Sequence, residues 1–389
     1  MRPTPELGPA RSLLLVLFTF LTLTLVQVVV PLRLDDLHVD AIAIGALLAL
    51  PSLTGLIAET PFAAISDAVG RRAVISLGAV MLLGSSALMA LADAAWVLAL
   101  ALILYGVGLG AQTSALMAAL SESVPPERSA HLQGWNGAVQ RIGAMGVAGL
   151  VVVTSEPSTL LWFVGVASLA CLGLAAAVPH WRFGEGQRRP PWRQTYAAAF
   201  GVLRRSSLVQ AGAMYNVLLS VLFITTNSFV ALILVTTGNP LPLAALLLVR
   251  DLTSVLLASV FGNLAAALGW RRCFLIGMVA GTTAMLIGVL IPADSPWMYI
   301  LFGLCGITTG FGIAGANLAV TYGTDPAERA LGMVAAGYAG RLASLVAPIV
   351  LAFAFSRTAA VGVFAVSLAA AASVTIRAVW ILRRRTSLA

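Results

Sequence analysis

Residues 63–72 read AAISDAVGRR and join two long apolar runs through a polar turn that is only a few residues long. A second copy, GNLAAALGWRR at residues 262–272, again lies between two apolar runs. Gly70 and Gly269 occupy the same place in the two copies, about 200 positions apart. The chain therefore repeats itself around this turn.

The same separation recurs further along the chain. The matched residues are Asp93 with Asp294, Gly106 with Gly306, Gly110 with Gly310, Glu127-Arg128 with Glu328-Arg329, and Arg141 with Arg341. These matches indicate a tandem duplication of a unit of roughly 200 residues. Internal repeats of hydrophobic segments are typical of transporter folds, which bind their substrate between the repeats.

The composition predicts that most of the chain lies in lipid. It is 60% hydrophobic and 10% charged, whereas a soluble domain is about 25% charged. About twelve apolar runs are long enough to cross a hydrocarbon layer of roughly 30 Å, where helices satisfy their own backbone groups. We expect an all-α integral membrane protein with two pseudo-symmetric six-helix bundles. The bundles would occupy residues 1–180 and 208–389, joined by a basic cytoplasmic linker at 181–207.

The net charge of +8 does not point to nucleic acid, because the positive residues are sorted along the chain. Every basic residue other than histidine is arginine. If both termini are cytoplasmic, most arginines fall on the inner side and only Arg33 and Arg357 lie outside, as the positive-inside rule predicts. The three cysteines lie in different apolar runs, with neither a disulfide framework nor a metal-ligand spacing.

The duplication, the basic central loop and the D-x-x-G-R-R turn together resemble the major facilitator superfamily over essentially the whole chain. In that family the turn reads approximately G-x-L-A-D-[RK]-x-G-[RK]-[RK], and the matching residues here are Asp67, Gly70, Arg71 and Arg72. The resemblance implies that these four residues form a conformational latch. It also implies a multi-pass protein of a bacterial inner membrane that works by alternating access.

This sequence departs from the family pattern at several places. Ala63 replaces the first glycine of the turn, and Ala68 replaces its first basic residue, which suggests a looser latch. Drug–proton antiporters of the family commonly carry an arginine in the fourth span, where this chain has Tyr105 and Gly106. The fifth span also lacks their glycine-proline motif. These departures weigh against a standard proton–drug antiporter.

Five ionisable residues are predicted to lie inside spans: Arg141, Arg341, Arg250, Asp251 and Glu59. Each costs at least about 2.5–3.5 kcal/mol at the bilayer centre, so each requires a partner or a cavity. Arg250 and Asp251 point about 100° apart on a helix, so they need not pair. The charges therefore form either structural locks or a site for an anionic substrate, which three arginines against one acid near the midplane would suit.

Helical spacing groups polar residues around these charges. Gln133, Gly137 and Arg141 recur every four residues, and Tyr338, Arg341 and Ser344 every three. In the same way Asp251 and Ser254 share one face of their helix. The candidate substrate contacts are Arg141, Arg341, Arg250, Gln140, Asn136, Gln112, Tyr338 and Asn227. Asp251 or Glu59 is the candidate proton site, because burial raises a carboxyl pKa toward neutrality.

We therefore expect proton-coupled efflux of a small organic compound that carries an anionic group. The alternatives are uptake of an organic anion by proton symport and, in a separate class, lipid flipping. An enzyme is not expected, because the three histidines lie in or beside loops and no nucleophile with a base is recognisable. We expect a monomer with no cofactor, no metal ion and no nucleic-acid partner.

Overall fold

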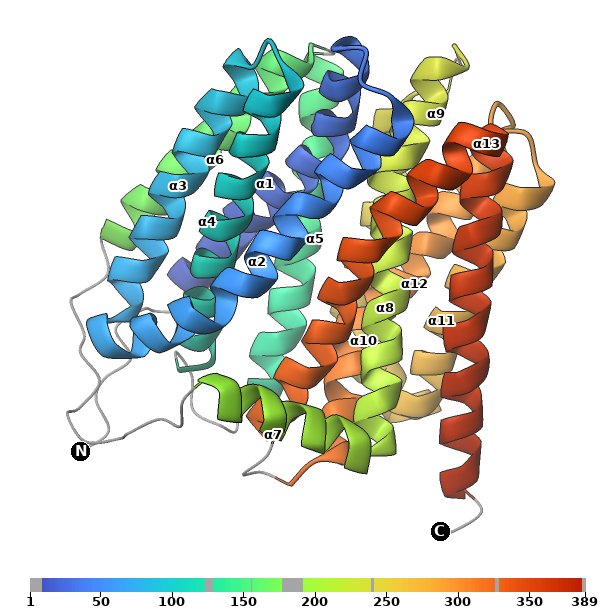
Figure 1. The fold of residues 1–389 in the computed structure, drawn as a ribbon. Coiled ribbons are helices and arrows are strands. Elements are labelled where there is room, and N and C mark those ends of the chain that lie inside the picture. Colours follow the sequence, from blue (N-terminus) through green and yellow to red (C-terminus); the bar gives the residue numbers. More distant parts are fainter. Residues whose placement is uncertain are drawn as a thin grey trace. The chain divides into compact units, whose positions relative to one another are not determined.

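The computed structural model describes residues 9–122, 129–154, 156–176, 192–238, 241–325 and 329–386. Every regular element among them is a helix (Figure 1). In the first half these are α1 (Pro9–Asp36), α2 (Ala41–Val69), α3 (Arg71–Leu91), α4 (Ala95–Glu122), α5 (Ser129–Val153) and α6 (Pro157–Ala176). In the second half they are α7 (Trp192–Arg205), α8 (Ser207–Ile224), the π-helix η2 (Thr225–Phe229), α9 (Val230–Thr236), α10 (Leu243–Leu268), α11 (Trp270–Leu290), α12 (Met298–Gly323) and α13 (Arg329–Thr386).

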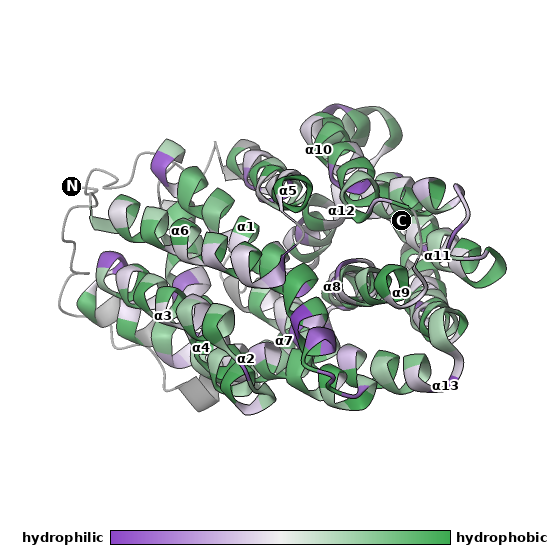
Figure 2. Ribbon diagram, turned by 90° about the horizontal axis from the view of Figure 1, so that it is seen from above, coloured by the Kyte–Doolittle hydropathy of each residue, from purple (hydrophilic) through white to green (hydrophobic). Residues whose placement is uncertain are grey.

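In the described part of the chain, 11 helical stretches are long and apolar enough to cross a membrane. Hydrophobic residues predominate in these helices (Figure 2). The elements α8, η2 and α9 form one such stretch, Ser207–Thr236. The last stretch has 52 residues but loses helical geometry at Thr358 (φ −139°, ψ 17°) and Ala359 (φ 49°, ψ −134°). It therefore makes two passes, which confirms the predicted all-α fold with twelve spans.

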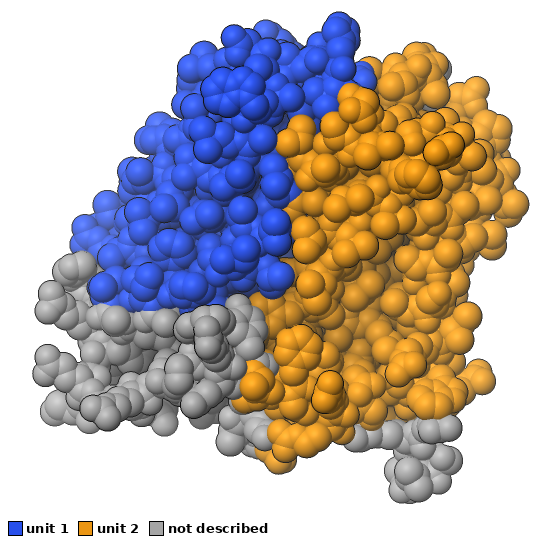
Figure 3. Space-filling model, viewed as in Figure 1, with its two compact units in different colours: residues 1–39, 50–192 blue, residues 40–49, 193–389 orange. Residues whose placement is uncertain are grey.

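The chain divides into two compact units (Figure 3). Unit 1 comprises residues 1–39 and 50–192, and unit 2 comprises residues 40–49 and 193–389. Within unit 1, α1 packs on α4, α5 and α6, and α3 packs on α4 and α6. Within unit 2, α8 packs on α12 and α13, and α11 packs on α12 and α13. The duplicated sequence thus produces the same pattern of helix packing twice.

The duplicated glycines Gly106, Gly110, Gly306 and Gly310 explain part of this packing. A Cβ atom on any of them would collide with the backbone of a neighbouring helix, α2 in unit 1 and α10 in unit 2. The nearest carbonyl oxygens are those of Pro51 at 2.5 Å, Gly55 at 2.9 Å, Arg250 at 2.5 Å and Ser254 at 3.0 Å, respectively. Small residues four apart let two helices in a membrane approach this closely.

Gly70 and Gly269 end the second and eighth spans in the same way. Gly70 has φ 101° and Gly269 has φ 86°, a conformation that L-residues with a side chain rarely adopt. Each turns the chain directly from one helix into the next, α2 into α3 and α10 into α11. The glycines that revealed the duplication are therefore required by the backbone.

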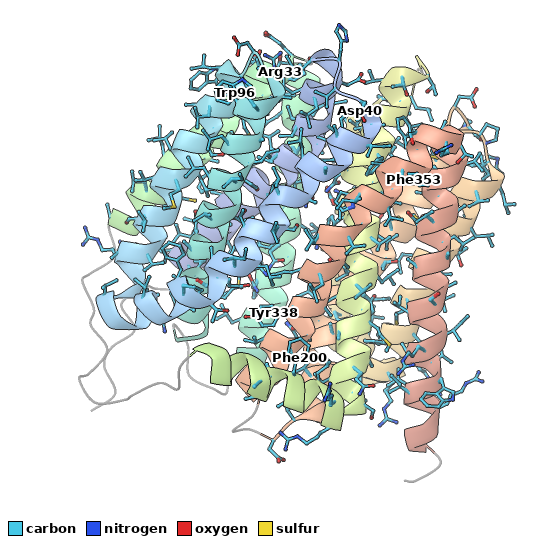
Figure 4. All side chains as sticks on the ribbon, in the orientation of Figure 1. Arg33, Asp40, Trp96, Phe200, Tyr338 and Phe353 are labelled. Carbon is cyan, nitrogen blue, oxygen red and sulfur yellow. The ribbon has the colours of Figure 1, made fainter. Side chains whose placement is uncertain are left out.

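The described part of the predicted basic linker contains α7, a helix with two different faces. Ala199 and Val202 are buried in one hydrophobic cluster with Val209, Val320 and other residues of unit 2. On the other face Phe200 is 52% exposed (Figure 4). The end of this helix carries Arg204 and Arg205. Residues 181–191 of the linker lie outside the described residues.

Candidate functional site

Unit 2 contains a buried ion pair between neighbouring residues of α10. Arg250 is 1% exposed and Asp251 is 0% exposed. The Arg250 Nε donates to Asp251 Oδ1 at 2.8 Å, and Nη2 donates to Oδ2 at 2.9 Å. The expectation that these residues need not pair is wrong, because the long arginine side chain brings its guanidinium back to the adjacent carboxylate. The two charges neutralise each other within one turn of helix.

The π-helix η2 holds the other side of the same guanidinium. Arg250 Nη1 donates to Thr226 Oγ1 at 2.9 Å and also to Asn227 Oδ1. The guanidinium carbon lies 5.5 Å from the ring centre of Phe223, within the range of a cation–π contact. Arg250 thus links α10 to the seventh span through neutral side chains, while its charge is paired with Asp251 on its own helix.

A polar run in the sequence of the seventh span coincides with the π-helix. Residues 225–228 read TTNS, a polar run inside an otherwise apolar span, and all five residues of η2 are buried. The hydroxyls of Thr225 and Thr226 donate to the carbonyls of Val221 and Leu222. Single-turn π-helices occur frequently at functional sites. The sequence analysis gave Asn227 as a candidate substrate contact, and the structure places it against Arg250. The sequence analysis did not identify Thr226 or Phe223 as contacts of Arg250, although the polar run was a signal for Thr226.

Ser254 lies one turn beyond Asp251 on α10, as the predicted shared face requires. Both residues are fully buried. Within the described residues, the Ser254 hydroxyl has no hydrogen-bond partner. A buried polar group without a partner is costly, so this hydroxyl is a donor available for a water molecule or a rearranged side chain.

Unit 1 carries the second predicted group, on α5. Arg141, Asn136 and Gln140 are all buried, and Gln140 Nε2 donates to Asn136 Oδ1 at 3.2 Å. Arg141 lies twelve residues beyond the first residue of α5, near its middle. The polar stripe predicted from four-residue spacing is therefore a buried group in the structure, apart from Gln133, whose side chain lies outside the described residues.

Arg341 occupies the equivalent place on α13 in unit 2. It also lies twelve residues beyond the first residue of its helix. Tyr338, Arg341 and Ser344 are each half-buried, and Figure 4 labels Tyr338 on the first segment of α13. The helix places this second stripe where the spacing predicted it, in a less buried environment than Arg141.

Gln112 serves a contact between helices within unit 1. It is buried on α4, and its Nε2 donates to Thr19 Oγ1 on α1 at 2.8 Å. Thr19 in turn donates to the Leu15 carbonyl. This arrangement gives Gln112 a structural bond, while a role as a substrate contact stays a prediction.

The predicted latch is partly described. The Asp67 side chain lies outside the described residues, so its role stays a prediction. Arg71 is 8% exposed, and its Nη1 donates to Ser66 Oγ at 3.0 Å across the Gly70 turn. This bond joins the end of α2 to the start of α3 and so stabilises the turn. Arg72 is half-buried, as is Glu59, the other candidate proton site, two turns before Asp67 on α2.

Among the described residues, no group of three or more histidine, cysteine, aspartate or glutamate side chains could hold a metal ion. The chemistry available in these two groups is that of guanidinium, carboxylate, amide and hydroxyl side chains.

The fold has twelve spans, the same helix packing in each half, and an arginine at the same position of corresponding helices, Arg141 and Arg341. These features define a membrane protein built from two homologous six-span halves. The sequence model of the Major Facilitator Superfamily matches residues 12–249, more than half of the chain. The protein therefore belongs to this superfamily of secondary transporters, whose members are not enzymes. A search of curated protein sequences finds no significant match.

Several solved structures are similar over nearly the whole chain. The nucleoside transporter NupG has a TM-score of 0.74 at 12% identity, covering 96% of this chain and 98% of that one. The human organic anion transporter MFSD10 (TETRAN) has a TM-score of 0.67 at 15% identity, covering 97% and 100%. A POT family transporter in complex with 5-aminolevulinic acid has a TM-score of 0.75 at 11% identity, covering 97% of each chain. At these identities the likeness shows the fold alone.

Proposed function

We propose that this transporter carries a small organic anion by alternating access, with Arg141 and Arg341 as the contacts to its anionic group. The supporting observation is the bidentate pairing of Arg250 with Asp251, which neutralises the acid in the middle of the eighth span. In the described spans, Arg141 and Arg341 also lie at mid-helix, and Glu59 is the acid of the second span. The balance of charge at membrane depth is positive, which favours an anionic ligand.

Arginine suits this role better than lysine, whose ammonium group acts as a point charge. Its planar guanidinium binds a carboxylate or phosphate through two parallel hydrogen bonds. The neutral amides of Asn136 and Gln140 are buried on the same helix as Arg141 and would add polar contacts without cancelling its charge. One structural relative is described as an organic anion transporter, which agrees with this class of substrate.

Arg250 takes a different part in the proposal. Its bonds to Asp251, Thr226 and Asn227 support a role as a structural link rather than as a substrate contact. Asp251 and Glu59 remain the candidate groups for coupling to protons. Protonation of Asp251 would remove the negative half of the ion pair and release the Arg250 guanidinium from Asp251, so that the arginine can change partners during transport.

We further propose export by proton antiport, with uptake by symport as the alternative. Purified protein in proteoliposomes distinguishes the two, once a carboxylate that stabilises the protein is known. Antiport predicts that an acidic lumen drives accumulation of the carboxylate, because protons leave as substrate enters. Symport predicts accumulation when the outside is acidic. Accumulation without any dependence on the pH gradient would contradict proton coupling in either direction.

A further inference from the structure

The second copy of the turn contains one residue more than the first. Residues 70–72 read GRR, whereas residues 269–272 read GWRR, with Trp270 between the glycine and the two arginines. In the first copy Arg71 begins α3, is 8% exposed and bonds back to α2. In the second copy the arginines come one position later in α11, which turns them by about 100° around the helix axis. The inserted tryptophan therefore gives Arg271 a different environment.

Trp270 packs among aromatic side chains of α11 and α12. Its ring stacks on that of Tyr322, with centres 5.5 Å apart and planes 19° apart, and meets the edge of Phe274 at 6.3 Å. The guanidinium carbon of Arg271 lies 5.8 Å from the centre of the Trp270 ring, within the range of a cation–π contact. Tyr322 is 61% exposed. The tryptophan thus holds an arginine beside an exposed aromatic ring.

The end of α7 adjoins this aromatic group. The hydroxyl of Ser206, the residue that follows α7, donates to the Gly323 carbonyl at the end of α12, at 2.6 Å. Gly323 is the neighbour of Tyr322 in the chain. The last two residues of α7, Arg204 and Arg205, are exposed. Basic and aromatic side chains from three helices therefore lie at one end of unit 2.

This end of unit 2 carries an excess of positive charge. Among the side chains that the structure describes there, the charged ones are Arg204, Arg205, Arg271, Arg272 and Arg383, with Asp325 as the acid. Each arginine lies at or next to the end of a membrane-spanning stretch, which is the depth of lipid headgroups. Tryptophan and tyrosine favour the same layer, and arginine binds phosphate through two parallel hydrogen bonds.

An apolar ridge on α10 leads to the same place. Its members recur every four residues and are Leu252, Leu256, Val260, Leu264 and Leu268. All of them are exposed except Leu264, which is half-buried. Residues four apart share a face of the helix, and α10 ends at the glycine turn directly after the last member. A phospholipid offers acyl chains to such a ridge and a phosphate to the arginines, whereas free phosphate offers only the second.

We infer that Trp270, Arg271, Arg272 and Tyr322 form a binding site for the headgroup of an anionic phospholipid, whose acyl chains lie along the ridge of α10. The arginines neutralise the phosphate, and the two stacked rings hold Arg271 at the headgroup layer. Every part of this site belongs to unit 2. The inference does not rest on the proposed substrate, so either can fail without the other.

The experiment follows the thermal unfolding of the purified protein in detergent micelles as lipid is added. Phosphatidylglycerol should stabilise the wild type more than phosphatidylcholine with the same acyl chains. Arg271→Gln combined with Arg272→Gln should bind phosphatidylglycerol about thirtyfold more weakly. The matched control is Arg357→Gln at the kink of α13, because Arg357 also lies over an aromatic ring, 5.3 Å from the centre of Phe353. This control should keep the wild-type preference.

Trp270→Ala keeps both arginines and should weaken the preference for phosphatidylglycerol less than the double variant does. Because each variant is compared in two lipids, a general loss of stability does not affect the result. Equal stabilisation of the wild type by the two lipids would overturn the inference, as would a double variant that keeps the wild-type preference. Equal stabilisation by inorganic phosphate in place of the lipid would also overturn it, since the acyl chains would then contribute nothing.

Discussion

The Arg250 guanidinium and the Asp251 carboxylate form two hydrogen bonds between adjacent residues of α10, at 2.8 and 2.9 Å, with both side chains fully buried. The same guanidinium holds Thr226 and Asn227 of the π-helix in the seventh span. Removing one partner of a buried ion pair strongly destabilises a protein, whereas replacing both partners by apolar residues changes its stability little. Variants of this pair therefore test whether it serves structure or proton coupling.

Replacing one partner should destabilise the protein far more than replacing both. Asp251→Asn leaves the Arg250 charge buried without a counter-ion and should cost about 3–5 kcal/mol. Arg250→Met combined with Asp251→Leu removes both charges and should recover most of that loss. Thermal unfolding of the purified variants measures the difference. A double variant as unstable as Asp251→Asn would show that the uncompensated charge of Arg250 is not the cause of the destabilisation.

The same double variant separates a structural link from a proton site. If Asp251 carries the coupled proton, the double variant should lose the effect of a pH gradient on transport while remaining folded. If Glu59 carries it, the double variant should keep that effect and Glu59→Gln should lose it. Transport in proteoliposomes under an imposed gradient gives the answer. Loss in neither variant would exclude both candidate carboxylates.

The duplicated glycines of α4 and α12 should tolerate no side chain. Gly306→Ala places a methyl group 2.5 Å from the Arg250 carbonyl oxygen, and Gly106→Ala does the same at Pro51. Overpacking of this kind costs about 1–3 kcal/mol. Gly303→Ala on the same helix α12 is the control, because its nearest neighbour would lie at 3.9 Å. Equal unfolding temperatures for the Gly303 and Gly306 variants would contradict the close helix contact.

The turn glycines should respond to substitution through the backbone. Gly70→Ala and Gly269→Ala force an L-residue to adopt φ near 101° and 86°, respectively. The strain should cost about 1–3 kcal/mol at each site. Asparagine should be as destabilising as alanine, because ψ of 150° at Gly70 and 136° at Gly269 places the backbone outside the left-handed helical region that asparagine visits. The unfolding temperatures of the four single variants test this expectation. Variants as stable as the wild type would argue against backbone strain.

Glu156 should give unit 1 a dependence on acidic pH. Hydrogen bonds from Thr159 and Ser158 to its carboxylate, with the charge of Arg33 adding to them, hold the pKa of Glu156 below its ordinary value of 4.5. Because the folded pKa is lowered, the stabilisation is present above pH 4.5 and is lost as the pH falls through the folded pKa.

The variant Glu156→Gln lacks the titrating carboxyl group and is the protein with which the wild type is compared. The wild type should lose more unfolding temperature than this variant when the pH falls from about 6 to about 3. The effect should be small, because the residue is exposed and water screens its charge. Parallel curves for the two proteins over that range would contradict the assignment.

The sequence was sufficient for the fold because its signals are local and repeated. Apolar runs of membrane length predict spans, and the two copies of the turn predict two related halves. Gly70, Gly106 and their partners in the second half could be recognised from their spacing, because each is demanded by backbone geometry that only glycine meets. Each of these requirements can therefore be recognised from a single residue type at a single position.

The details of the candidate site could not be predicted in the same way. Helical periodicity gives the direction of a Cα–Cβ bond, whereas the pairing of Arg250 with Asp251 depends on how a long side chain bends. The π-helix at Thr225–Phe229 is a local change of hydrogen-bond register, which the hydrophobic pattern of the seventh span does not reveal. For Arg141 and Arg341 the spacing predicted the helix face, and the choice of ligand requires an experiment.

The most direct test of the anion proposal is a ligand screen by thermal stabilisation, run on the wild type and on Arg141→Gln combined with Arg341→Gln. The panel contains matched carboxylates, amides and amines of equal size. The account predicts that carboxylates alone raise the unfolding temperature of the wild type and that the double variant loses this response. Stabilisation of both proteins alike by amines or neutral compounds would contradict it and would assign the two arginines to structure.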